Sequence, residues 1–254
     1  MTAYGPVLPN SAEAMPVQSF EISVPVEEDA GQSLTIRAYL KLRAQIISGK
    51  LAPGQRLKVE TLRDLIEVGA TPIREALSLL TSDGLVERLD KRGFRVSGVS
   101  LAEYDDLHRT RCWFEERALR ESIAEGDRAW EERLVLVHHR FRRLPRTLGD
   151  EAGIRSNPEW EQMHKLFHMS MLSASPSRTL LQFCDQLHDR LNRYRSVAAV
   201  GAHAPRDWKS EHDLIAEAVL DRNADLAVSR LMQHYSRTTD ILLDTLANLT
   251  TGPT

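Results

Sequence analysis

Residues 70 to 96 read ATPIREALSLLTSDGLVERLDKRGFRV, and this stretch sets the architecture of the N-terminal part of the chain. Thr71 is placed to cap a helix that has Pro72 at its first position, where a proline N–H is not missed. Asp83 and Gly84 are typical of a helix end. The apolar residues between them share one face of the predicted helix: Ile73, Ala76, Leu77 and Leu80.

The residues on either side of this helix complete a motif. LVERLDKRGFRVSGV (85–99) predicts two short strands around a turn at residues 90 to 93. Upstream, apolar spacing predicts a helix over residues 34 to 47 and a shorter one through VETLRDLIEV (59–68). Three helices followed by a hairpin are typical of a winged helix-turn-helix, in which the third helix enters the major groove of DNA.

The charge distribution singles out the same part of the chain. Residues 34 to 98 contain twelve Lys or Arg against seven Asp or Glu, although the whole chain has a formal net charge of -3. Such a local excess can supply contacts to phosphates, but an excess of charge is more often a solvated surface. The alternative to a DNA-binding domain is a small helical subdomain with an ordinary hairpin.

We expect two elements of this motif to contact DNA, namely the outward face of the third helix and the tip of the hairpin. Arg74 is the expected reader of bases or phosphates, and a glycine at the tip permits close approach to the sugar-phosphate backbone. The predicted DNA-binding residues are Thr71, Arg74, Ser78, Lys91, Arg92 and Gly93.

After Ser100 the sequence reads as long amphipathic helices separated by Gly, Pro and Asn breaks, which predicts an antiparallel helical bundle. The expected helices cover residues 101–125, 128–144, 157–174, 177–198, 207–221 and 223–248. The predicted fold is mainly α, with a flexible tail over residues 1 to 32, a winged helix-turn-helix over 33 to 99, and an all-helical domain over 100 to 250.

Several protein classes are disfavoured by composition. No apolar run approaches the length of about 20 residues that a membrane-spanning helix needs. The two cysteines are too few to frame a small disulfide scaffold, and no basic and apolar signal segment opens the chain. We therefore expect a cytoplasmic protein.

Four of the nine histidines form a pattern. His164 and His168 are four residues apart, so their rings extend from one face of a helix. His212 lies eleven residues before Asn223 and His234 eleven after it, so in an antiparallel helix pair the two stand level. We predict that these four rings bind one divalent ion, zinc or nickel.

The alternative is a set of unrelated helix histidines, because pairs at this spacing arise often by chance. His188, near Leu187 and Leu191, is a weaker candidate for the same site. The remaining histidines have the spacing of ordinary surface or core residues.

The chain resembles a known family, the GntR-type bacterial transcription regulators of the FadR class, whose C-terminal half is the helical FCD domain. The N-terminal match is LRAQIISGKLAPGQRL (42–57) followed by residues 71 to 96. The C-terminal matches are RCWFEERAL, FHMSML and EHDLIAEAVLDRNADLAVSRLMQH. The resemblance runs from about residue 34 to 248, and the combination EWEQMHKLFH, GATPIREALS and NRYR is most similar to the carbon-starvation-induced repressors of glutarate and GABA use.

The resemblance implies site residues. Metal-binding family members carry an Asp, a His four residues later and two further histidines; His168, His212 and His234 match these positions, and His164 stands at the Asp position. Arg111 matches the pocket arginine of the family, and Arg195 is a looser candidate for the same role. In the third helix this chain has Gly69 and Ala70 where most relatives have Ser-Arg, so its operator is expected to differ.

On this resemblance we hypothesise a homodimeric repressor that binds a palindromic operator and is released by a small organic acid at the metal, such as the dicarboxylate glutarate. The sequence itself does not determine whether the effector releases or promotes DNA binding. Arg111 and Arg195 are the expected effector contacts. One rival is a helical-bundle metalloenzyme, since Glu161 with His164 and Asp185 with His188 resemble the Glu-x-x-His pairs of di-iron sites. Another is a DNA-binding dimer without an effector.

Overall fold

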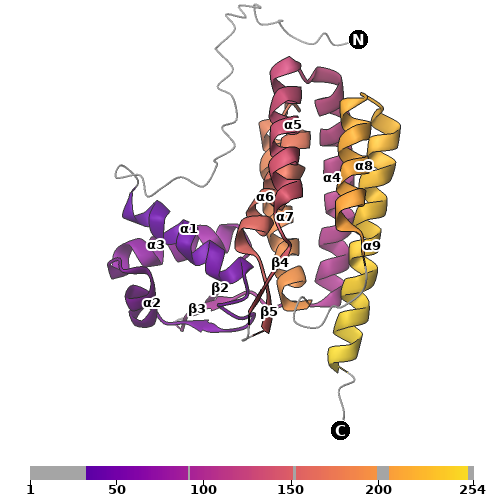
Figure 1. The fold of residues 1–254 in the computed structure, drawn as a ribbon. Helices are drawn as coiled ribbons and strands as arrows, with labels where there is room; N and C mark the ends of the chain where they lie inside the picture. Colours follow the sequence, from indigo (N-terminus) through magenta and orange to yellow (C-terminus); the bar gives the residue numbers. More distant parts are fainter. Residues whose placement is uncertain (1–32, 91, 151–152, 199–205, 251–254) are drawn as a thin grey trace, which may run out of the picture.

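The computed structural model describes residues 33–90, 92–150, 153–198 and 206–250 of the chain. A smaller part with α1, α2, α3 and a small sheet lies beside the lower half of a long helical part (Figure 1). The tail expected over residues 1 to 32 and Lys91 of the predicted hairpin tip lie outside the described residues.

The smaller part has the predicted order of three helices and a hairpin. Its elements are α1 (Leu34–Ile47), β1 (Arg56–Leu57), α2 (Val59–Ile66), α3 (Ala70–Ser82), β2 (Val86–Leu89) and β3 (Gly93–Val96). The strands form an antiparallel sheet in the order β1-β3-β2, and the short β1 was not predicted. One core joins the helices to the sheet through Ala38, Leu42, Ile46, Leu62, Ile66, Ile73, Leu77, Leu80, Val86 and Val96.

The predicted cap of α3 is wrong. The helix begins at Ala70 with Gly69 as its N-cap, and no side chain accepts a hydrogen bond there. Thr71 is therefore the second helical residue, and Pro72 follows it in the first turn, where a backbone N–H has no intrahelical acceptor. The helix ends as predicted, since Gly84 adopts a positive φ of 72° and the Leu85 N–H bonds to the Leu80 carbonyl.

The larger part is a helical bundle, as predicted. Its helices are α4 (Leu101–Glu125), α5 (Arg128–Arg143), α6 (Pro158–Leu172), α7 (Arg178–Ala198), α8 (Trp208–Leu220) and α9 (Ala224–Thr250). Side chains of Ser100, Asp127, Asn157 and Asp207 cap four of them. In the part of the chain that the structure describes, none of these helices is both long and apolar enough to span a bilayer.

One element of the larger part was missed. Where the sequence predicts only a break between Pro145 and Pro158, an antiparallel hairpin pairs β4 (Thr147–Asp150) with β5 (Gly153–Ser156). The hairpin is held at its base, because the Asn157 N–H bonds to the Arg146 carbonyl at 3.0 Å. The side chain of Asn157 also donates to the Pro145 carbonyl at 2.7 Å. These bonds fix Arg146 beside the start of α6.

The core of the bundle explains why α6 turns its histidines inward. Trp130, Leu134 and Phe141 of α5 pack against Trp160 and Phe167 of α6 in one apolar cluster. His164 and His168 lie on the same buried side of α6, with 2% and 1% of their surfaces exposed. A second cluster, at the other end of α4, joins Tyr104 and Leu107 to α7 and α9.

The two parts meet along α7. Arg43 of α1 forms an ion pair with the buried carboxylate of Asp189, which also accepts from Lys165 of α6 at 2.7 Å. Arg193 of α7 donates to the carbonyls of Ser97 and Gly98 in the connecting segment. The helix α7 thus contacts α1, the connecting segment and α6 at once.

Candidate functional site

Four histidine rings from three helices converge inside the bundle. His164 and His168 come from α6, His212 from α8 and His234 from α9, and one ring nitrogen of each lies within 4.8 Å of the others. All four are buried. Nitrogen ligands about 2.1 Å from one zinc ion are themselves roughly 3 to 4 Å apart, so the cluster has nearly the dimensions of a metal site. We call these four residues the histidine cluster.

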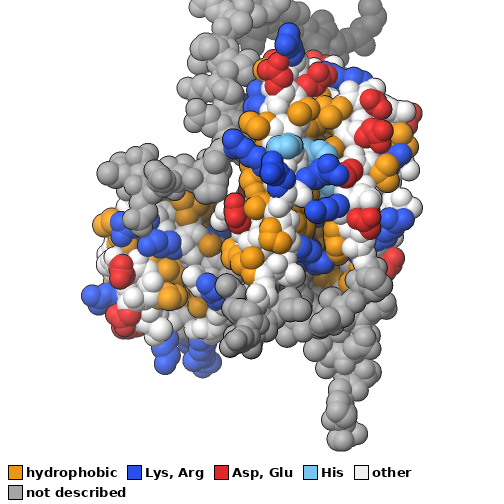
Figure 2. Space-filling view, viewed as in Figure 1, with side chains coloured by type: hydrophobic (Ala, Val, Ile, Leu, Met, Phe, Trp, Pro, Cys, Tyr) orange, Lys and Arg blue, Asp and Glu red, His pale blue; other side chains and the backbone are white. Residues whose placement is uncertain are grey.

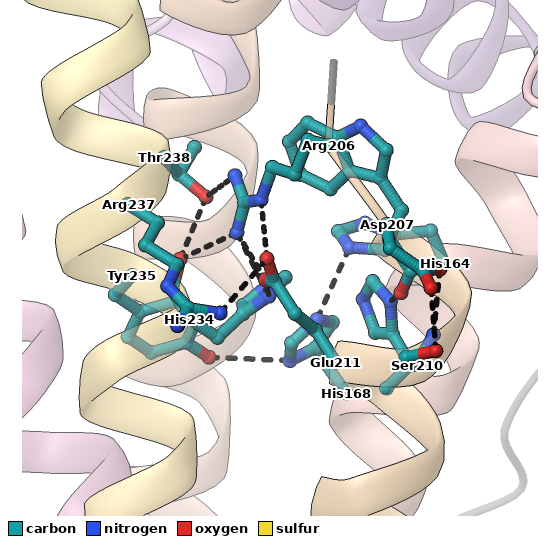
Figure 3. A network of polar contacts seen from close by, with 12 residues as sticks. His164, His168, Arg206, Asp207, Ser210, Glu211, His234, Tyr235, Arg237 and Thr238 are labelled. Carbon is teal, nitrogen blue, oxygen red and sulfur yellow. Dashed lines mark hydrogen bonds and ion pairs between the residues drawn. The ribbon is translucent and has the colours of Figure 1, made fainter.

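Three rings of the cluster present the same nitrogen to its centre. Nδ1 of His212 donates to the Trp208 carbonyl at 2.5 Å, and Nδ1 of His234 faces Glu211 Oε2 at 2.9 Å. Nδ1 of His168 lies 3.2 Å from the Tyr235 oxygen, whose own proton goes to Glu115. Each Nδ1 therefore carries the proton, which leaves the Nε2 lone pair available for a metal ion. Figure 3 shows His168, Glu211, His234 and Tyr235 in this network.

Arg206 also approaches His234, with a guanidinium nitrogen 3.2 Å from Nδ1. That guanidinium already donates to Glu211 and to the His234 carbonyl. A carboxylate 2.9 Å from Nδ1 requires a proton between the two atoms. His234 is therefore a donor at Nδ1 even though Arg206 lies close to the same atom.

His164 is arranged differently. Its Nδ1 lies 3.1 Å from Arg195 Nη1, while the other nitrogen of that guanidinium is paired with Glu161. Because an arginine only donates, Nδ1 of His164 is an acceptor, and in the neutral ring the proton sits on Nε2. His164 Nε2 lies 3.1 Å from His168 Nε2, the distance of a hydrogen bond from the first ring to the second.

Burial keeps the cluster neutral. Desolvation lowers the pKa of His164, His168 and His212 well below the ordinary value, and lowers that of His234 to about 4 although Glu211 favours its protonated form. For Glu211 burial acts in the opposite direction, but Arg206 and His234 lower its pKa overall. At neutral pH the cluster thus offers uncharged imidazoles, the form that binds metals.

Both arginines predicted to bind an effector lie at the opening beside the cluster, where Arg111, His164, Leu191, Arg195, His234 and Tyr235 line a pocket. Arg111 is mostly engaged with protein groups: its Nε donates to Glu115 at 2.7 Å and its Nη2 to the Tyr235 hydroxyl at 2.8 Å. Arg195 is paired with Glu161. Each therefore already has a carboxylate partner.

Three polar residues of the site were not predicted, namely Arg206, Glu211 and Tyr235. Glu211 directly precedes His212, and Tyr235 directly follows His234, so proximity in the sequence is the one signal that could have found them. Arg206 stands just before α8, and its Nε donates to Glu211 at 2.8 Å while Nη1 donates to Thr238 at 3.0 Å.

A further cation, Arg146, lies against the aromatic wall of the site. Its guanidinium stacks 4.1 Å from the ring centre of Trp208 and 5.7 Å from that of Trp160, which itself stacks on His164. No carboxylate of the described residues forms an ion pair with it, in contrast to Arg111, Arg195 and Arg206. Burial, with Arg195 and Arg206 nearby, lowers the pKa of Arg146 to about 10.

The other histidines stay outside the cluster. His188 of α7 is buried, and its ring centre lies 5.9 Å and 6.2 Å from those of His164 and His168. Among the described residues, neither of its nitrogens has a hydrogen-bond partner. His138 pairs with Asp213 at 2.9 Å. The carboxylates needed for a di-iron site are used elsewhere, since Glu161 pairs with Arg195 and Asp185 with Lys165.

The predicted DNA-binding residues form an exposed surface on the smaller part. Thr71, Arg74 and Ser78 lie on the outer face of α3, opposite its buried residues, and Arg92 and Gly93 are exposed at the hairpin tip. Gly93 has a φ of 92°, a conformation that favours glycine. Figure 2 shows Lys and Arg side chains gathered at the lower edge of this part.

Comparisons with known proteins match both parts of the chain. Residues 34–96 match the family of bacterial regulatory proteins described as gntR, and residues 106–237 match the FCD domain. The HTH-type transcriptional regulator BphR of Paraburkholderia xenovorans is 34% identical over 92% of this chain and 95% of its own length. The HTH-type transcriptional repressor GlaR of Escherichia coli is 27% identical over 84% of this chain and 97% of its own.

Solved structures show the same fold. The Escherichia coli regulator McbR/YncC superposes with a TM-score of 0.70 at 20% identity, over 85% of this chain and 99% of its own. A GntR regulator from Rhodococcus gives a TM-score of 0.64 at 20% identity, over 84% and 99% of the two chains. At this identity the likeness extends to the fold alone.

Proposed function

The chain belongs to the GntR family of bacterial regulatory proteins and has an FCD domain after its winged helix, so it is a DNA-binding transcriptional regulator and not an enzyme. We propose that it is a homodimeric repressor that binds a palindromic operator. The histidine cluster would hold a divalent ion to which a small carboxylate effector could bind, and binding of the effector would release the DNA.

The convergence of four buried, neutral imidazoles supports the metal. Nitrogen ligands of this kind suit zinc or nickel, and the Nε2 atoms of His168, His212 and His234 are oriented to hold the ion. Oxygen partners behind these three rings fix their orientation, as is common in metal sites. When bound, such an ion acts as a Lewis acid to which a carboxylate oxygen can bind.

The charge of the site favours an anionic effector. Neutral histidines leave the +2 charge of the ion uncompensated, whereas an aspartate at the position of His164, which the family resemblance implies, would remove one unit of it. Glu161 and Glu211 are already paired with Arg195 and Arg206, and Arg146 adds a further positive charge nearby. An organic anion with two carboxylates, such as glutarate, would therefore match the site better than a neutral ligand.

The contacts of α6 and α7 support a route from the site to the DNA-binding part. Lys165 directly follows His164 of the cluster, and Asp189 directly follows His188. Both belong to the buried ionic group that holds Arg43 of α1. A ligand that moves α6 or α7 would thus shift α1 and the orientation of the two recognition helices in a dimer, so that the half-site spacing no longer fits.

Similarity to a repressor is consistent with this direction of control. We propose that the protein is one of the carbon-starvation-induced regulators of glutarate and GABA use, because it resembles them in the motifs EWEQMHKLFH, GATPIREALS and NRYR. A regulator of this kind would act in the cytoplasm, where its operator lies.

A gel-shift titration tests the proposal, with the DNA upstream of the chain's own coding region as the probe. The protein should bind this DNA, glutarate should release it, and prior treatment with a chelator should abolish the effect of glutarate. If neither glutarate, other dicarboxylates nor chelator changes the affinity, the protein is a DNA-binding dimer without this effector.

A further inference from the structure

The histidine cluster does not contain four equivalent rings. His168, His212 and His234 each hold the Nδ1 proton against an oxygen, from Tyr235, Trp208 and Glu211 respectively. At Nδ1 of His164 the neighbouring group is a donor, the guanidinium of Arg195. Arg206 also approaches Nδ1 of His234, but there the Glu211 carboxylate lies closer and accepts the proton. The Nε2 atom of His164 therefore bears a proton and has no lone pair for an ion.

We infer that the ion is held by His168, His212 and His234, and that His164 is a hydrogen-bond donor to the anion bound beside it. This inference rests on the proposed function, because it divides the roles within the proposed metal and effector site. It departs from the expectation of four histidine ligands, which follows from spacing and from the family pattern.

The position of Arg195 is well determined by its neighbours. Glu161, three residues before His164 on α6, pairs with the guanidinium and leaves Nη1 directed at His164. The side chain of Arg195 is largely buried, and its guanidinium lies 5.8 Å from the ring centre of Trp160. To expose a lone pair at Nε2, His164 would have to move its proton to Nδ1 and break the contact with Arg195.

The ring of His168 shows what role the Nε2 proton of His164 has. In the tautomer that Arg195 favours, the His164 N–H points to Nε2 of His168, 3.1 Å away, whose lone pair is one of the three that face the centre. Once that lone pair binds an ion, the N–H needs another acceptor, and a buried donor without a partner costs about 1 to 3 kcal/mol. A carboxylate oxygen on the ion satisfies it, so Arg195 and His164 together act as a relay of donors toward the anion.

Three histidines and an open position are also a recurrent arrangement of zinc sites that bind an exchangeable ligand. A four-histidine site is closer to the closed, structural type. A histidine at position 164 that donates instead of binding the ion leaves a position open and adds a donor beside it, which increases the preference of the site for an anion.

Cobalt(II) titrations of the full chain, purified without a polyhistidine tag, test the inference. His164→Leu should bind one cobalt ion with an affinity within about tenfold of the wild type, the smallest loss expected for an outer partner of a ligand. His168→Leu should lose more than about 100-fold. Glutarate should shift the visible cobalt spectrum of the wild type but not that of His164→Leu, and His164→Gln, whose amide can donate, should recover part of the shift.

If His164→Leu loses cobalt as completely as His168→Leu, His164 is a ligand and the inference is wrong. A wild-type chain that binds no cobalt would overturn the proposed metal site as well. If circular dichroism shows that His164→Leu is unfolded, Arg195→Met tests instead whether Arg195 keeps His164 from binding the ion. Without the donor at Nδ1, His164 can turn a lone pair inward, so the cobalt spectrum should change; an unaltered spectrum contradicts the role of Arg195.

Discussion

At the scale of single residues, the site depends on which atom holds each proton. The spacing of histidines in the sequence was sufficient to predict that four rings meet, because helix periodicity and a level antiparallel pair determine where side chains lie. It could not show the tautomers, since these depend on Trp208, Glu211, Tyr235 and Arg195, which come from other turns and helices.

Neutral buried histidines make the stability of the metal-free protein depend on pH. His234 titrates at about 4 in the folded chain and near 6.5 when unfolded, so between these values the unfolded state binds more protons. Stability should therefore decrease as the pH falls from 6.5 toward 4, and His234 alone contributes a loss of about 3 kcal/mol. Urea denaturation at pH 7, 5.5 and 4.5 measures this loss. It should be smaller in His234→Gln.

Arg146 provides a second prediction at this scale. If its guanidinium contacts the second carboxylate of the effector, Arg146→Gln should weaken glutarate binding about tenfold or more, as expected for a lost charged hydrogen bond. Acetate, which has one carboxylate, should bind both proteins equally. Calorimetry of the zinc-loaded proteins measures both affinities, with Arg128→Gln as a control at the exposed start of α5. Equal losses for the two anions would exclude this role.

At the scale of elements, caps and breaks in the sequence predicted the helices well, and the remaining errors have physical causes. The bundle helices end near Gly126, Pro145, Ser175 and Asp221 because capping and loop residues stop helices locally. The hairpin β4–β5 was missed, since its strands TLGD and GIRS hold only one large apolar residue each, which is too little alternation to predict a sheet. The start of α3 was misplaced because a glycine N-cap leaves no side-chain signal.

The element that reads DNA is predicted to be α3. Arg74 is exposed on its outer face, so Arg74→Ala should preserve the fold and weaken operator binding by about 1 to 3 kcal/mol, or roughly 5- to 150-fold. Fluorescence anisotropy with the upstream DNA measures this change, and Arg128→Ala serves as the matched control. Retention of full affinity and sequence preference in Arg74→Ala would assign recognition to another element.

At the scale of the whole molecule, α7 connects the histidine cluster to the winged helix. Such a connection is not visible in the sequence, because Arg43, Lys165 and Asp189 are far apart along the chain and meet only where α1 and α6 both pack on α7. Truncation of Arg43 leaves Lys165 to neutralise Asp189, so the bundle should keep its fold and its ion.

We therefore predict that Arg43→Ala binds zinc and operator DNA but responds less to glutarate. The concentration of glutarate that releases half of the DNA should rise about fivefold or more, the lower end of typical coupling between two sites. Lys50→Ala, an exposed change in the same part of the chain, should behave like the wild type. An unchanged glutarate response in Arg43→Ala would rule out this route.

The metal content of the protein, purified without a polyhistidine tag and reconstituted with zinc or nickel, tests the central claim most directly. Native mass spectrometry should find one ion per chain in the wild type and none in His168→Ala or His212→Ala. Wild-type protein that retains no ion, or variants that retain as much as the wild type, would contradict a metal centre in the histidine cluster.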